Sequence, residues 1–352
     1  MAVTTRDAVT LARDWVTSEA RNKDGFMAAY LAGSLNRQDD MSVLRPSTDV
    51  DIHILQEGSA QWERMTVCKG VTLQVALREL SSYCTHEQIL AHPFESYNLT
   101  FGKLLYDPYG FLGRFQVALR PEWARKSWVL TRCYAELCLA KQRFSRAALG
   151  TSLIQSSMAW IMGIQALSGI LANAWLRPPT YRRCLLMMHQ DVALASQEEI
   201  FAQGRNDLIE MVLQLAGWNR MSRSQVINLL ERVARCFNNV AAAGARPASP
   251  PFQAMICDGF RPMAIDGSRE MIDEGYHREA MFWIHFITSI LVEILATREG
   301  VQERVYADQV WRDLLESTGF SSSSLQARSA LVTEVCENTI RLAEAICHRK
   351  YS

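Results

Sequence analysis

Apolar residues in the first third of the chain follow two different periods, which predict a mixture of helices and short strands. Residues 5–22 carry apolar side chains at the spacing of one helix face, and 85–92 fit a second, shorter helix. Short apolar runs bounded by glycine or polar residues predict strands; these are 26–32, 49–55, 71–77 and 99–106. The turn residues at 107–110 close the last of these strands.

From about Pro121 onward, helical periodicity dominates and no strand pattern is found. The expected helices are 122–148, 151–176, 180–194, 196–216, 222–243, 268–298, 302–318 and 323–348. They are separated by turn signals, and the run AAAGARPASPP at 241–251 predicts a mobile loop. We therefore expect an α+β protein, with a small mixed-sheet domain over 1–118 and an all-α helical bundle over 119–352.

Charge and cysteine content narrow the partners and the compartment. The 352 residues include 37 Lys plus Arg and 37 Asp plus Glu, so the formal net charge is zero. That balance gives no general attraction for nucleic acid, and we expect no nucleic-acid partner. Nine cysteines without a Cys-x-x-Cys pair argue against a zinc site or a disulfide framework. Together with an N-terminal sequence that lacks a signal-peptide pattern, they predict a cytoplasmic protein.

Two stretches are apolar enough to raise the question of a membrane. Residues 153–176 and 281–297 are both rich in large apolar side chains, but each also carries polar side chains. The second stretch is too short for a full span. Both are interpreted as buried helices of a bundle, and we expect no membrane partner.

Residues 26–55 carry the clearest chemical pattern. A predicted strand ends at Gly33-Ser34, and the next strand carries Asp49 and Asp51 at i and i+2, so that both carboxylates project from one face. Paired carboxylates suit Mg²⁺, and two such ions can hold a triphosphate during transfer. Gly33 lets the backbone approach phosphate, Ser34 offers a hydroxyl and a backbone N–H, and Arg37 offers a positive charge.

The segments GSLNR at 33–37, STDVDIHIL at 47–55 and LLYDPYG at 104–110 resemble the nucleotidyltransferase superfamily with the DNA-polymerase-β-like palm. The resemblance covers about the first 115 residues and is greatest to antibiotic nucleotidyltransferases that have a helical second domain. It implies Mg²⁺-dependent transfer of a nucleoside monophosphate, AMP from ATP, to a hydroxyl of a small molecule. It also implies two Mg²⁺ ions on Asp49 and Asp51, and phosphate contacts from Gly33, Ser34 and Arg37.

One position departs from the family pattern. The family commonly places a third carboxylate on the next strand, whereas this chain has Leu73-Gln74-Val75. An amide cannot serve as a base, so a base is expected elsewhere, with Glu136 as a candidate. Two alternatives stay open: a catalytically weak nucleotide-binding or regulatory protein, and a protein-adenylylating toxin. The charge balance disfavours a template-dependent polymerase.

Several other residues have both a functional and a structural interpretation. Arg177, Arg182 and Arg183 could reach a triphosphate from the helical half, although a solvated helix edge is the favoured interpretation. His53 shares the strand face of Asp49 and Asp51 and could lie behind the metal site. The remaining candidates are His277 at a polar helix terminus, His285 in the core, and Trp123 and Trp128 near the domain junction as an acceptor pocket.

Overall fold

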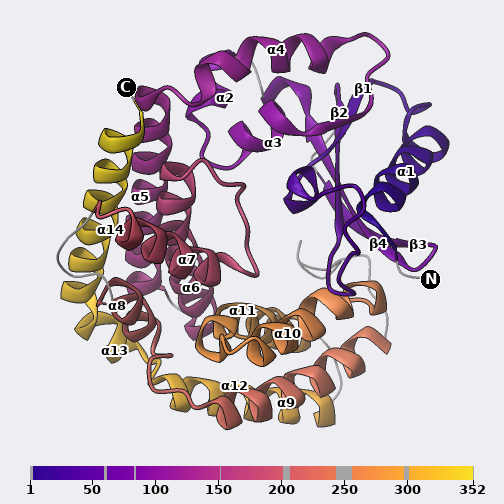
Figure 1. Cartoon of the computed structure of the whole chain (residues 1–352). Helices are drawn as coiled ribbons and strands as arrows, with labels where there is room; N and C mark the ends of the chain where they lie inside the picture. The colour runs from indigo at the N-terminus through magenta and orange to yellow at the C-terminus, as the bar shows by residue number, and fades with distance from the viewer. Residues whose placement is uncertain are drawn as a thin grey trace.

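The computed structural model describes residues 3–58, 62–82, 85–150, 152–200, 207–242, 256–296 and 301–351. Its N-terminal part is a five-stranded mixed sheet with helices, and the remainder is a large helical region (Figure 1). This confirms the α+β class. The domain boundary at 118 stays a prediction, and helix α4 (Phe111–Trp123) runs across that position.

The sheet has the strand order β3-β4-β2-β1-β5. Its strands are β1 (Phe26–Leu31), β2 (Val50–Gln56), β3 (Trp62–Cys68), β4 (Val71–Glu79) and β5 (Lys103–Tyr106). Strand β2 pairs parallel with β4, and the other pairs are antiparallel. The strands predicted at 26–32, 49–55 and 71–77 are confirmed as β1, β2 and β4. Strand β3 was not predicted, because its sequence WERMTVC mixes charged and apolar residues instead of forming an apolar run.

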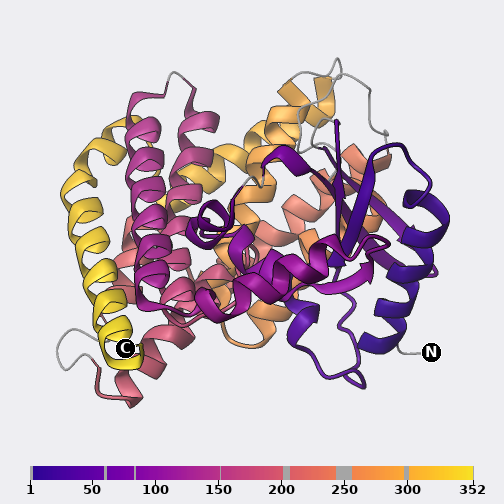
Figure 2. The same ribbon diagram turned by 90° about the horizontal axis from the view of Figure 1, so that it is seen from above.

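Each face of the sheet is covered differently, and this fixes where β2 presents its polar residues. Helix α1 (Thr5–Trp15), which continues as a short π-helical turn to Ala20, packs on the face that contains Ile52 and Ile54. Helices α2 (His86–Ala91), α3 (Glu95–Phe101) and α4 pack on the opposite face. Strand alternation places Asp51 and His53 on that second face. The helical region also lies on the side of the sheet away from α1 (Figure 1 and Figure 2).

The strand predicted at 99–106 is wrong over its first half. Helix α3 extends to Phe101, and only Lys103–Tyr106 is a strand. Residues 95–100 are buried on all sides, so their apolar pattern did not distinguish helix from strand. The change of direction falls at Gly102, where an added Cβ would lie 2.4 Å from the Tyr30 ring and 2.5 Å from the Asn98 carbonyl oxygen.

The helical region contains α5 (Lys126–Leu149), α6 (Leu153–Ala174), α7 (Cys184–Gln197), α8 (Asp207–Ala216), α9 (Arg223–Ala242), α10 (Gly267–Asp273), α11 (His277–Ala296), α12 (Val301–Thr318), α13 (Ser322–Ala327) and α14 (Ser329–Lys350). Two of the predicted helices are each divided into two helices in the structure. The segment 268–298 is interrupted at Gly275, whose φ of +95° breaks the helix, and 323–348 is interrupted at Arg328. The loop predicted at 241–251 lies outside the described residues beyond Ala242.

Both apolar stretches form core helices. Helices α6 and α11 are long and apolar enough to cross a membrane by length and composition alone. However, 61% of the most apolar 18-residue stretch of α6 and 89% of that of α11 is buried inside the fold. This burial is what the central helices of a bundle show.

The helical region touches the sheet domain at several places, and two of these contacts show how the elements connect. At one, the fully buried Arg132 of α5 donates hydrogen bonds to the carbonyl oxygens of Leu90 and Trp123, each at 2.9 Å. At the other, Thr72 Oγ1 of β4 donates to the Gly259 carbonyl oxygen at 2.6 Å. The elements therefore follow one another around a ring that closes on the sheet (Figure 1).

Candidate active site

Asp51 lies directly against the Gly33-Ser34 bend. Gly33 has a φ of +69°, and a Cβ added there would lie only 2.0 Å from Asp51 Oδ2. The carboxylate therefore occupies the space that any other residue at 33 would need for its side chain. The Ala32 N–H also donates to the Asp51 carbonyl oxygen at 2.8 Å. The structure thus brings together two of the predicted site residues.

The bend is held in place by two asparagine side chains that sequence reasoning did not single out. The Gly33 N–H donates to Asn98 Oδ1 of α3 at 3.3 Å, and the Lys103 N–H donates to Asn36 Oδ1 at 3.2 Å. Ser34 is exposed and begins a short 3₁₀ helix that runs to Arg37. The first N–H groups of such a turn have no partner within the turn, so they can donate hydrogen bonds to an anion.

Asp49 stands one residue before β2 and is partly buried. The alternation of β2, extended back by one residue, would give it the face of Asp51, with about 6.6 Å between their Cα atoms at the usual rise per residue. Burial raises the pKa of Asp49, and the nearby Arg182 guanidinium and a backbone N–H oppose that shift. Asp49 is therefore a carboxylate in a sheltered place with a positive charge near it.

That positive charge comes from the helical half. Arg182 Nη1, from the connection between α6 and α7, donates to the Ser47 carbonyl oxygen at 2.8 Å. The favoured interpretation of a solvated helix edge is thus wrong for Arg182. The other two arginines weighed with it form ion pairs elsewhere: Arg177 lies 2.9 Å from Asp191, and Arg183 lies 2.7 Å from Glu274.

Arg37 joins the two parts of the chain. Its Nε donates to the Tyr97 hydroxyl at 2.8 Å, and its Nη2 donates to the Leu176 carbonyl oxygen at 2.6 Å. The guanidinium also lies 4.9 Å from the centre of the Tyr97 ring. A phosphate contact from Arg37 stays a prediction, because in this arrangement its donors serve Tyr97 and Leu176.

Gln74 is the register partner of Asp51 across the parallel β2–β4 pair, so both side chains emerge from the same face. Across the ranges that the structure describes, no group of three or more His, Cys, Asp or Glu side chains is arranged to hold a metal ion. The amide at Gln74 accords with that result. Asp49 and Asp51 still fit Mg²⁺, which commonly takes one or two carboxylates and completes its shell with phosphate and water oxygens.

His53 belongs to a buried polar cluster behind Asp51. Its Nδ1 lies 3.1 Å from the Tyr30 hydroxyl and 3.9 Å from Glu95 Oε2, and Glu95 lies 3.6 Å from Arg78 Nε. Burial, with a smaller effect of Arg78, lowers the pKa of His53 to about 3. His53 is therefore neutral at physiological pH and supports the strand instead of exchanging protons.

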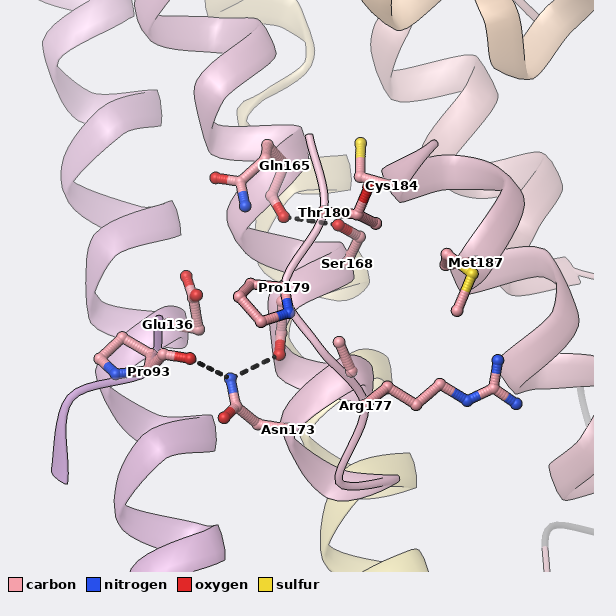
Figure 3. A pocket seen from close by; sticks show the side chains of 12 residues that line it. Pro93, Glu136, Gln165, Ser168, Asn173, Arg177, Pro179, Thr180, Cys184 and Met187 are labelled. Carbon is pink, nitrogen blue, oxygen red and sulfur yellow. Dashed lines mark hydrogen bonds between the residues drawn. The ribbon is translucent and has the colours of Figure 1, made fainter. Parts of the chain in front are cut away.

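Glu136 lies in a small pocket of the helical half, between α5, α6 and the start of α7 (Figure 3). Ser168, Asn173, Arg177 and Thr180 also line this pocket. Burial raises the pKa of Glu136 to about 7, against the opposing charge of Arg143. Among the described residues, no hydrogen bond reaches its carboxylate, although only 5% of the residue is exposed.

The other weighed residues have structural roles. His285 is fully buried with its Nε2 2.5 Å from Ser157 Oγ, which confirms a core histidine. His277 Nε2 lies 3.1 Å from the Met221 carbonyl oxygen at the start of α11. Trp123 is 5% exposed and packs beneath the guanidinium of Arg132, so it belongs to the core, and an acceptor pocket at Trp123 and Trp128 stays a prediction.

Comparison with known proteins adds little to this geometry. No protein-family model matches the chain, and no curated protein matches it. Among solved structures, it is distantly similar to a nucleotidyltransferase-like protein from Exiguobacterium sibiricum 255-15, with 8% identity over 88% of each chain and a TM-score of 0.28. A likeness this weak carries no argument about function, so the site has to be judged by its own residues.

Proposed function

We propose that this chain is a Mg²⁺-dependent nucleotidyltransferase that moves AMP from ATP to a hydroxyl of a small-molecule acceptor. The observation that carries the proposal is the contact between the Asp51 carboxylate and Gly33, with Asp49 two residues earlier, just before the strand begins. A tight glycine bend beside paired carboxylates can receive a triphosphate together with its metal. The resemblance of GSLNR and STDVDIHIL to the superfamily motifs supports the same reaction.

In this reaction the acceptor oxygen bonds to the α-phosphorus, the bond from that phosphorus to its bridging oxygen breaks, and pyrophosphate leaves. Bound Mg²⁺ would neutralise the negative charge on the attacking acceptor oxygen and on the leaving bridging oxygen. Asp49 and Asp51 would hold the metal, and the backbone N–H groups and hydroxyl at Ser34 would orient the phosphates. The hydroxyl proton needs a base, and Gln74 cannot accept it. Glu136 stays the candidate from the sequence: it lies in the pocket of the helical half and its pKa is raised to about 7, and a base must in addition lie within hydrogen-bond reach of the acceptor hydroxyl.

The second candidate function is nucleotide binding with little or no transfer. The pairing of Asp51 with Gln74 favours it, because the place of the family's third acid is taken by a neutral amide. Such a protein would bind Mg²⁺–ATP through the same residues and release pyrophosphate slowly or not at all.

Transfer of the α-phosphate of ATP to an acceptor separates the two candidate functions. The purified chain is incubated with Mg²⁺, α-labelled ATP and a panel of hydroxyl-bearing small molecules, with Asp51→Asn as the matched control. Transfer of label to an acceptor, lost in Asp51→Asn, supports the enzyme. Binding of Mg²⁺–ATP without turnover supports the second candidate, and failure to bind Mg²⁺–ATP contradicts both.

A further inference from the structure

The connection between α6 and α7 runs along the sheet domain and touches it repeatedly. The Leu176 carbonyl oxygen accepts a hydrogen bond from Arg37, and the Tyr181 ring lies 5.5 Å from the Phe94 ring. Arg182 then reaches the Ser47 carbonyl oxygen, two residues before Asp49. This connection therefore brings a side chain of the helical half to the edge of the candidate site.

Arg182 sits in a slot built to admit it. A Cβ added to Gly267, the first residue of α10, would lie 2.9 Å from Arg182 Cζ, so the guanidinium packs directly against this glycine. Its Nη1 donates to Ser47 and, at 3.5 Å, to the Met263 carbonyl oxygen. Its Nε is buried and finds no acceptor in the part of the chain that the structure describes. The guanidinium thus keeps an unused donor.

Two acids attract the Arg182 guanidinium, Asp49 more strongly than Glu270. Glu270 already accepts a hydrogen bond from Ser47 Oγ at 2.7 Å and lies 3.8 Å from Arg45 Nη1. The other two arginines nearby, Arg45 and Arg183, both pair with Glu274. A cation beside an expected metal ligand would repel Mg²⁺ on its own. The negative charge of a triphosphate removes that conflict, because it attracts both the metal and the guanidinium.

We propose that Arg182 binds the triphosphate of the nucleotide, so that the helical half takes part in nucleotide binding and not only in acceptor binding. This inference rests on the proposed function. The planar guanidinium can present two parallel N–H groups to phosphate oxygens, and the unused Nε–H is one of them. Without nucleotide, the same group stays beside Asp49 and on Ser47.

The test compares two ligands that differ in their phosphates. Calorimetry gives the Kd of α,β-methylene-ATP and of AMP, each with Mg²⁺, for the wild type, Arg182→Gln, Arg182→Lys and the control Arg183→Gln. Arg182→Gln should weaken binding of the ATP analogue about 10- to 100-fold, the size expected for a lost charged hydrogen bond, and weaken AMP less than about 3-fold. Arg182→Lys keeps the positive charge but loses the two parallel N–H groups of the guanidinium, so the loss of affinity should be smaller than in Arg182→Gln. Arg183→Gln should bind both ligands like the wild type.

Each other outcome overturns the inference in a recognisable way. Wild-type affinity of Arg182→Gln for the ATP analogue would show that Arg182 does not touch the phosphates, while the proposed function stands. Equal losses for the ATP analogue and AMP, with a lowered Tm, would assign Arg182 to holding the two halves together. If Arg182→Gln does not fold, Arg182→Lys decides between the same outcomes. Failure of the wild type to bind the ATP analogue would overturn the proposed function and this inference together.

Discussion

Asp51 and Gln74 are register partners on adjacent parallel strands, and their side chains emerge side by side from the same face of the sheet. The carboxylate also touches Gly33, so Gln74 borders the place where metal and phosphate are proposed to bind. An acid at Gln74 would add a third negative charge to that place. Its absence lowers the attraction for Mg²⁺ without disturbing the strands.

Replacing Gln74 by Glu should therefore raise the affinity for Mg²⁺ in the presence of nucleotide. The substitution keeps the side-chain size and adds a hard oxygen ligand next to Asp51. We expect a gain of about tenfold, equivalent to about 1.4 kcal/mol. The measurement is the Mg²⁺ dependence of nucleotide binding, with Gln74→Asn as the neutral control. No change in Gln74→Glu would mean that position 74 does not face the metal.

Gly33→Ala should remove activity because its Cβ would collide with the Asp51 carboxylate. A matched control exists at Gly58, which has the same φ of +69° but no heavy atom within 4 Å of an added Cβ. Both variants should lose about 1 kcal/mol of stability from backbone strain. Gly33→Ala should additionally reduce nucleotide binding at least about tenfold. Equal binding by Gly33→Ala and Gly58→Ala would contradict the contact.

Arg132→Met should destabilise the whole chain. Arg132 is fully buried, and its loss leaves the carbonyl oxygens of Leu90 and Trp123 without their donor. We expect a loss of about 2–4 kcal/mol in the free energy of unfolding. The exposed Arg125, paired with Glu122, provides a control whose replacement by Met should cost under about 1 kcal/mol. Denaturant unfolding measures both, and similar losses would contradict the role of Arg132.

The stability should depend on pH through Glu136. Burial raises the pKa of Glu136 to about 7, from an ordinary value of 4.5. The folded chain therefore keeps a proton in this interval that the unfolded chain has released. The contribution of Glu136 to the free energy of unfolding is therefore greatest below about pH 4.5. It falls as the pH rises towards about 7, by up to about 1.4 kcal/mol per pH unit.

Glu136→Gln removes this titration, so the free energy of unfolding of the variant should fall less steeply between pH 5 and 7 than that of the wild type. Denaturant unfolding at several pH values gives both slopes. Identical slopes would show that Glu136 titrates normally in the folded chain. Because the comparison is between two chains that differ at one residue, other buried acids such as Asp191 affect both equally.

Local sequence patterns were sufficient for much of the fold. The apolar runs that form β1, β2 and β4 are short and bounded by polar or glycine residues, so they were recognisable as buried strands. Strand β3 lacked such a run. Helix α4 lies outside the predicted helices because a proline is typical of a helix boundary, whereas Pro121 stands within the last turn of this helix.

In the candidate site, local sequence patterns predicted some contacts and could not predict others. The Gly-Ser bend and Asp51 are eighteen residues apart, and the motif predicted their contact. Arg182 reaches Ser47 across 135 residues, and Asn98 reaches Gly33 across 65. No local pattern encodes such contacts. The only sequence signal for Arg182 was a pair of arginines after Pro178-Pro179, which is equally typical of a solvated helix start.

The central claim is that Asp49 and Asp51 hold Mg²⁺ on a nucleoside triphosphate beside Gly33. The most direct measurement is calorimetric binding of Mg²⁺ and α,β-methylene-ATP to the wild type, Asp49→Asn and Asp51→Asn, with circular dichroism to confirm that all three are folded. The account predicts tight binding by the wild type and a loss of at least about 100-fold, about 2.7 kcal/mol, in each variant. Wild-type affinity in both folded variants would contradict it.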